Sequence, residues 1–213
     1  MPTDPTLDRE RALFAGGASL VIGVDEVGRG AVAGPVMVGV AVIRATPEFP
    51  TGLRDSKLLS ARARERLVEP VGEWADAIEI GAASAHEIDE YGIVSSLARA
   101  AERAFAALAI AGLDVTGAEV ILDGTHNWLN GALIPNVTVR VQPKADRDCA
   151  VVAAASVWAK VHRDRLMVEA GGEADPYRWA SNKGYGSEQH FDAIREHGAT
   201  EFHRRTWLSS VLG

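Results

Sequence analysis

The stretch Leu20-Val-Ile-Gly-Val-Asp-Glu-Val-Gly-Arg-Gly30 is an apolar run that ends in two adjacent carboxylates, Asp25 and Glu26, and a glycine-flanked arginine. Segments rich in valine and isoleucine favour β-strands, so residues 20–27 are predicted to form one. A strand is a costly place for two negative charges unless a cation, a hydrogen-bond donor or the exposed strand end compensates them. The pair therefore indicates a metal or phosphate site at the end of this strand.

The residues that follow predict a β-hairpin. Residues 36–43 are again rich in valine, and the connection Gly28-Arg-Gly-Ala-Val-Ala-Gly-Pro35 is rich in breakers and too short for a crossover helix. A dinucleotide-binding loop, which has similar glycine spacing, would need a helix directly after it. The valines after Pro35 recur with a period of two instead, which favours a strand and argues against a nucleotide-binding module or a nicotinamide-dependent oxidoreductase.

The rest of the pattern predicts an α/β fold. Further strands are expected at residues 77–83, 118–122 and 137–141, and helices from Ser60 to about Glu69 and over residues 93–110, 148–169 and 187–197. Pro70 and Gly72 are expected to weaken the first of these helices. Three successive strands followed by helix, strand, strand and helices predict a mixed five-stranded sheet flanked by helices, with the first three strands antiparallel.

Composition fits one domain in a reducing compartment. The 213 residues carry a net charge of −7 and one cysteine, Cys149, so the chain has neither an internal disulfide nor a cysteine-based zinc site. Basic residues concentrate in runs at residues 54–66, 160–165 and 203–205, each expected to be solvated unless the runs converge on an acidic site. We expect a flexible tail at residues 1–17, a single domain at 18–213 with a helical region from about residue 170, a monomer, no membrane association and a cytoplasmic location.

Two further carboxylates match the opening pair. Asp123 ends a predicted strand, as Asp25 does, and Asp146 precedes a predicted buried helix, so all three can lie at one edge of the sheet. Oxygen ligands of this kind suit Mg²⁺, although a turn or a helix cap is the alternative role for each aspartate taken alone. Because side chains alternate along a strand, Asp25 and Glu26 can serve one metal only if a bulge or the strand end turns one of them.

Short motifs run in order along residues 20–207: Asp25-Glu26-Val27-Gly28-Arg29-Gly30, Asp55-Ser56-Lys57, Asp123-Gly124, Lys144-Ala145-Asp146, Ala154-Ala155-Ser156 with Ala159-Lys160-Val161 and Arg163-Asp164, Gly184-Tyr185-Gly186, and His203-Arg204. In these motifs the chain resembles the bacterial ribonuclease HII family, the type 2 ribonucleases H. It departs from the family at Ala145, where glycine is common, and at Gly186, where proline is common. The first departure puts the local backbone angle in question, and the second the stiffness of the loop that carries Tyr185.

The resemblance implies a ribonuclease H-like fold and an endonuclease that hydrolyses the RNA strand of RNA/DNA hybrids. It also implies nicking of duplex DNA at embedded ribonucleotides, with 3′-hydroxyl and 5′-phosphate ends, so hybrids and ribonucleotide-containing duplex DNA are the expected partners. By the same resemblance the catalytic residues, which hold divalent metal as Mn²⁺ or Mg²⁺ with two ions in the active complex, are Asp25, Glu26, Asp123 and Asp146. Substrate binding is implied for Gly28, Arg29, Gly30, Lys57, Lys144, Lys160 and Tyr185.

Several of these residues have plainer alternative roles. The three lysines can instead form structural salt bridges, and Ser156 is expected to bond the preceding turn of its helix rather than act as a nucleophile. Trp128, in the loop after Asp123, is expected to pack in the core, with substrate contact as the alternative. A non-catalytic hybrid-binding protein would be expected to lack one or more of the four carboxylates. Surface positions are expected for His86, His126, His190 and His197.

Overall fold

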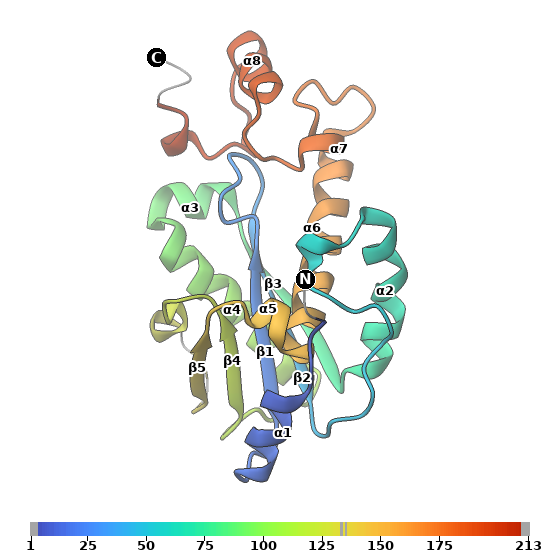
Figure 1. Cartoon of the computed structure of the whole chain (residues 1–213). Coiled ribbons are helices and arrows are strands. Elements are labelled where there is room, and N and C mark those ends of the chain that lie inside the picture. Colours follow the sequence, from blue (N-terminus) through green and yellow to red (C-terminus); the bar gives the residue numbers. More distant parts are fainter. Residues whose placement is uncertain (1–3, 133, 135, 210–213) are drawn as a thin grey trace.

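One mixed β-sheet organises the protein. The computed structural model describes residues 4–132, 134 and 136–209 (Figure 1). The strands are β1 (Val21–Val27), β2 (Val36–Ile43), β3 (Ala77–Ala83), β4 (Glu119–Asp123) and β5 (Thr138–Gln142), and they lie in the order β3-β2-β1-β4-β5. The first three strands are antiparallel, whereas β4 and β5 run parallel to β1. The predicted strands and their pairing are therefore confirmed, each boundary lying within one residue of its predicted place.

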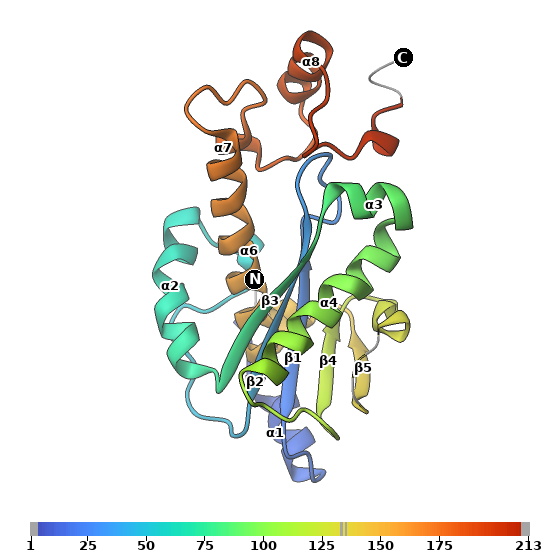
Figure 2. The ribbon, with the colours of Figure 1, turned by 180° about the vertical axis from the view of Figure 1, so that it is seen from behind.

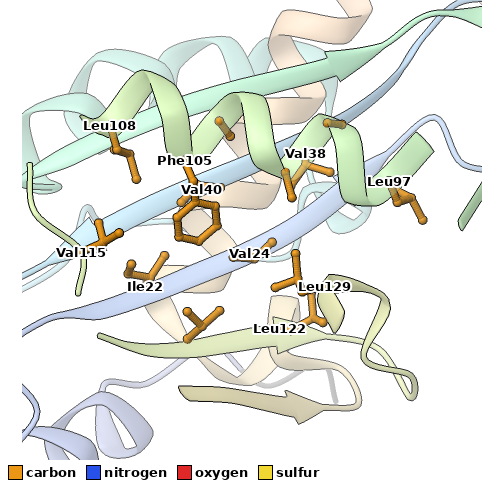
Figure 3. Packing of buried hydrophobic residues seen from close by; sticks show 14 of the residues in the cluster. Ile22, Val24, Val38, Val40, Leu97, Phe105, Leu108, Val115, Leu122 and Leu129 are labelled. Carbon is orange, nitrogen blue, oxygen red and sulfur yellow. The ribbon is translucent and has the colours of Figure 1, made fainter. Parts of the chain in front are cut away.

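Helix α4 (Ile93–Ile110) covers one face of the sheet. It lies across the front of the strands in Figure 2, and its bounds match the predicted helix. Its apolar residues recur at helical spacing and interdigitate with alternate residues of the strands. Figure 3 shows this contact, in which Phe105 lies among Ile22, Val24 and Val40. This face buries the larger apolar cluster, and Glu26 follows Ile22 and Val24 on the same side of β1.

Helix α6 (Ala150–Gly171) covers the other face at unusually short range. A Cβ atom built on Gly23 would lie 2.5 Å from the backbone of Val151, and one on Gly39 would lie 2.5 Å from the carbonyl oxygen of Ala155. The helix can approach so closely because glycine faces it from the strands and alanine fills its own first half. The predicted helix over 148–169 begins later, since Cys149 is extended and separates α6 from the short helix α5 (Ala145–Asp148).

Helix α2 (Ala61–Trp74) packs beside α6 and continues past Pro70. Ser60 caps it as predicted, by accepting a hydrogen bond from the Ala63 amide. The predicted end near Glu69 is wrong, because the buried side chains of Leu67 and Val71 hold the helix on both sides of the proline. Shorter helices complete this part of the chain: η1 (Ser56–Leu58), α3 (Ala85–Tyr91) and η2 (Trp128–Gly131).

The N-terminal segment is packed, which corrects the expected tail at residues 1–17 where the structure describes it. Helix α1 (Asp8–Ala15) buries Leu7 and Leu13 in the cluster beneath α6. The Thr6 backbone exchanges hydrogen bonds with Asp148 and Ala150. Residues 1–3 lie outside the described part. The sequence did not predict this packing because the segment has few apolar residues. Its buried apolar contacts come from two leucines.

The C-terminal region forms a helical cap beyond the β1–β2 connection (Figure 1). It comprises α7 (Trp179–Asn182), α8 (Glu188–His197) and η3 (Arg205–Trp207). A helical region was expected from about residue 170. His190 is buried here, so its predicted surface position is wrong; the aromatic residues around it exclude solvent. No helix in the described residues has the length and apolarity to cross a membrane.

The packing of the N-terminal segment can be tested by truncating one leucine. Leu7→Ala removes a side chain that is only 2% exposed, and we expect it to lower the free energy of unfolding by about 2–4 kcal/mol. Ile110→Ala, at a position that is 89% exposed, is the matched control and should change it by less than about 0.5 kcal/mol. Equal effects of the two variants in urea denaturation would contradict this packing and support a flexible N-terminal tail.

Candidate active site

A cavity of about 200 Å³ opens where β1 ends, and it collects most of the predicted site. Asp146 and Lys144 are the predicted residues that do not line it. Two serines that we did not predict as site residues, Ser56 and Ser156, do line it. The predicted residues among its lining are Asp25, Glu26, Gly28, Arg29, Gly30, Lys57, Asp123, Lys160 and Tyr185. Segments that are far apart in the sequence therefore meet at one edge of the sheet.

Asp25 and Glu26 share this cavity without a bulge. Strand β1 pairs with β2 in unbroken register through Val27, while its pairing with β4 stops at Val24. Beyond Val24 the strand has no neighbour on the β4 side, so side chains from both of its faces can border the same open edge. Of the two expected solutions, the structure uses the strand end. The left-handed backbone of Gly28, with φ of 82°, then turns the chain away.

Asp123 and Asp146 are joined through the start of α5. Asp123 Oδ1 accepts hydrogen bonds from the backbone amides of Ala145, at 2.7 Å, and of Asp146, at 3.4 Å. Asp123 therefore both borders the cavity and caps a helix, so the two roles considered for it coexist. The left-handed backbone angle in this segment falls on Lys144, with φ of 62°, and not on Ala145. Alanine is thus accommodated where the family commonly has glycine.

Burial and mutual repulsion raise the pKa values of three of these carboxyls. The pKa of Asp25 lies well above its usual range, first because the group is buried and next because Glu26 is negative. Burial also raises the pKa of Glu26 against the opposing effect of Arg29. Burial and then the charge of Asp146 raise the pKa of Asp123. The cluster therefore holds more negative charge than its surroundings neutralise.

Two basic side chains supply part of the missing positive charge. Lys57 Nζ lies 2.8 Å from Asp146 Oδ2, and Arg29 Nη1 lies 3.4 Å from Glu26 Oε1. Partial burial alone would lower the pKa of Lys57, but the bond to Asp146 and the charge of Asp25 raise it above its usual value. Among the described residues, no three Asp, Glu, His or Cys side chains are placed to ligate one ion in this arrangement.

The two serines tie Asp25 to α6 and to η1. Ser156 Oγ and Ser56 Oγ share a hydrogen bond at 2.9 Å, and a hydrogen bond that Ser156 donates to Asp25 holds the pKa of Asp25 lower than burial alone would. The predicted bond from Ser156 to the preceding turn is wrong, because the hydroxyl faces the strand. The η1 turn is held in place by Arg64, which donates to the carbonyl oxygens of Ser56 and Leu59.

Two buried arginines hold the backbone of residues 28–35, which we call the glycine segment. Arg204 donates to the carbonyl oxygens of Gly28, Arg29 and Gly34, at distances of 2.6–3.2 Å. Arg163 donates to the carbonyl oxygens of Ala33, Pro35 and Lys183. Both side chains are fully buried, so the expectation of solvated basic runs at 160–165 and 203–205 is wrong for them. Their partners are main-chain carbonyls that no sequence pattern identifies.

Tyr185 and Lys160 line the cavity together with the carboxylates. The Lys160 ammonium lies 5.7 Å from the centre of the Tyr185 ring and 2.5 Å from Asp164 Oδ1, so it has a salt bridge and still borders the cavity. Tyr185 is 36% exposed. Lys144 is exposed and points to no partner in the cavity lining. Trp128 is buried in the α4 core, which confirms the packing role.

Known structures share this fold. The ribonuclease H2 of Pyrococcus horikoshii OT3 aligns with 88% of this chain and 93% of its own, with a TM-score of 0.66 and 28% sequence identity. The fold thus places the protein in the ribonuclease H class of nucleases.

Sequence comparison narrows the class. The family model described as Ribonuclease HII matches residues 22–210. The ribonuclease HII of Streptomyces avermitilis is 44% identical over 211 residues, covering 97% of this chain and 85% of the relative. A ribonuclease HII of Thermus thermophilus is 44% identical over 186 residues, covering 87% of this chain and 85% of the relative. The chain belongs to the ribonuclease HII family.

The role of Arg204 can be tested with a side chain of similar length. Arg204→Met leaves several buried carbonyl oxygens without a donor, and we expect the free energy of unfolding to fall by about 2–4 kcal/mol. Arg205→Met, in the exposed neighbour, should change it by less than about 0.5 kcal/mol in the same urea titration. If Arg204→Met lowers the free energy of unfolding no more than Arg205→Met does, Arg204 does not hold the backbone in the way we infer.

Proposed function

We infer that this protein hydrolyses the RNA strand of RNA/DNA hybrids and nicks duplex DNA at embedded ribonucleotides, leaving 3′-hydroxyl and 5′-phosphate ends. The observation that carries this inference is the single cavity in which Asp25, Glu26 and Asp123 meet Gly28-Arg29-Gly30 and Tyr185. Membership of the ribonuclease HII family supplies the reaction class. We further infer that the enzyme acts as a monomer in the cytoplasm.

The residues present fit divalent metal. Every candidate ligand is a carboxylate oxygen, the donor that Mg²⁺ and Mn²⁺ prefer, and the bonded cations Lys57 and Arg29 number two against four carboxylates. Asp25, Glu26, Asp123 and Asp146 would hold the metal, two ions in the active complex. Bound there, the metal would activate the attacking water and stabilise the leaving oxygen of an in-line displacement.

The protein groups around the carboxylates would bind and orient the substrate. The Gly28-Arg29-Gly30 backbone can approach a sugar closely, where the 2′-hydroxyl distinguishes RNA from DNA. Arg29, Lys57 and Lys160 border the cavity and would contact phosphates, Lys57 by leaving Asp146. Lys144, which directly precedes α5 and does not line the cavity, would bind the strand outside it. Tyr185 would stack on the sugar at the junction with DNA.

The assignment of Asp123 can be tested by removing its charge. Asp123→Asn should lower cleavage of duplex DNA that contains one ribonucleotide by at least about a hundredfold in Mg²⁺ or Mn²⁺, because the effect of a ligand should exceed that of an outer-shell group. Asp192→Asn, on the exposed face of α8, is the control and should retain wild-type rates. Undiminished cleavage by Asp123→Asn, with a wild-type melting temperature, would refute the ligand role.

The reading role of Tyr185 can be tested separately. Tyr185→Ala should lower kcat/KM at a single ribonucleotide by about tenfold, since stacking on an aromatic ring contributes on the order of 1–3 kcal/mol. Tyr91→Ala removes another exposed tyrosine, on α3, and should leave the rate unchanged. If both variants cut the single-ribonucleotide duplex equally well, Tyr185 does not read the junction.

A further inference from the structure

A cluster of aromatic side chains lies behind Tyr185, on the side away from the cavity. Tyr177, Trp179, His190 and His203 are all buried, with exposed fractions between 0% and 7%. The Tyr177 and Trp179 rings stack at 5.2 Å, and His203 meets the Tyr177 ring edge-on at 4.7 Å. None of these side chains lines the cavity, so none contacts substrate in the proposed reaction. Two buried imidazoles without a carboxylate partner nevertheless call for an explanation.

The partners of each imidazole fix its tautomer. His190 Nδ1 lies 2.9 Å from the Tyr185 carbonyl oxygen, which can only accept, so Nδ1 carries the proton. His190 Nε2 then accepts from Trp179 Nε1 at 3.1 Å. His203 Nδ1 accepts from the Thr200 amide at 3.0 Å, which leaves its Nε2 to donate to His190 Nε2 at 3.2 Å. With both rings neutral, the Trp179 and His203 donors share the single lone pair of His190 Nε2, while His190 Nδ1 donates to the Tyr185 carbonyl oxygen.

Tyr185, whose carbonyl oxygen accepts the hydrogen bond from His190, lines the cavity. The Tyr185 amide donates to the Asn182 carbonyl, and the preceding Gly184 carbonyl accepts from the amides of Val32 and Ala33 in the glycine segment. The Tyr185 carbonyl is the remaining backbone anchor, and His190 holds it. The ring that this backbone carries lies 5.5 Å from the Arg163 guanidinium. A change in the anchor would therefore move the ring relative to the carboxylates.

We propose that His190 is a positioning residue that sets the place of the Tyr185 ring at the junction between ribonucleotide and DNA, with Trp179 and His203 fixing its tautomer. The proposal rests on the proposed function, because it presumes that Tyr185 reads that junction. It predicts a loss of selectivity, not a general loss of activity: long RNA/DNA hybrids present many equivalent registers, whereas a single ribonucleotide presents one. A purely structural role for His190 predicts equal losses on both substrates.

The experiment compares two variants of His190 that differ in one hydrogen bond. Asparagine places an amide near the position of Nδ1 and can still donate to the Tyr185 carbonyl, whereas leucine has no donor. The readout is the ratio of kcat/KM on duplex DNA with one ribonucleotide to kcat/KM on a uniform RNA/DNA hybrid. We expect His190→Leu to lower this ratio by about tenfold and His190→Asn to keep it within about threefold of wild type. His86→Asn, at an exposed position on α3, is the control and should keep the wild-type ratio.

A milder variant keeps the test decisive if His190→Leu does not fold. Trp179→Phe keeps an aromatic ring and removes the indole donor together with one ring of the bicycle, so it should lower the ratio in the same direction by about threefold. A ratio unchanged in His190→Leu, or in Trp179→Phe where the leucine variant is unfolded, overturns the proposal. So does an equal fall in His190→Leu and His190→Asn. Wild-type protein that cuts neither substrate would instead overturn the proposed function.

Discussion

The structure depends on the burial of Asp25 at the end of β1. A carboxylate with almost no exposure to water, beside Glu26 and near Asp123, is unfavourable in isolation, and its raised pKa records that cost. The nearby cations only partly offset it: Lys57 bonds to Asp146, and Arg29 to Glu26. A fold keeps such a feature when an external cation completes it. The residues around Asp25 thus hold in place a group of carboxylates that lacks a neutralising cation.

Helix α6 provides much of that support. The close contact of α6 with Gly23 and Gly39 fixes the distance between the helix and the sheet. Side chains from successive turns of α6 then reach the site. Ser156 bonds to Asp25, Lys160 borders the cavity, and Arg163 holds the glycine segment. Because one rigid helix carries all three, a shift of α6 would disturb Asp25, the part of the cavity that Lys160 borders and the segment from Gly28 to Pro35 together.

The C-terminal cap acts on the same segment from the other side. Arg204 binds the carbonyl oxygens of Gly28, Arg29 and Gly34, while Gly184 accepts from Val32 and Ala33. The cap therefore joins the glycine segment to the loop of Tyr185. Without it, neither the glycine backbone nor the tyrosine ring would have a fixed place relative to the carboxylates at the end of β1.

The sequence predicts the parts of this architecture that depend on periodicity. Valine alternation identifies β1 and β2, and strand ends identify Asp25 and Asp123. Other residues of the cavity lining, such as Lys57 and Tyr185, were predicted from the resemblance to the ribonuclease HII family. Periodicity could not reveal contacts made by single side chains with distant backbone. Arg204 looks like a solvated cation in its basic run, yet it is buried against carbonyl oxygens about 170 residues earlier in the chain. Leu7 and His190 were misplaced for the same reason, because their burial depends on tertiary partners.

The central claim is that the carboxylate cluster is destabilising until a divalent cation binds it. Thermal unfolding of wild type and Asp25→Asn, each with and without Mn²⁺, tests it most directly. Removing one buried charge should raise the stability of the metal-free protein by on the order of 1 kcal/mol. Mn²⁺ should stabilise the wild type and have little effect on Asp25→Asn. A metal-free Asp25→Asn that is less stable than wild type, or an equal Mn²⁺ effect on both proteins, would contradict the claim.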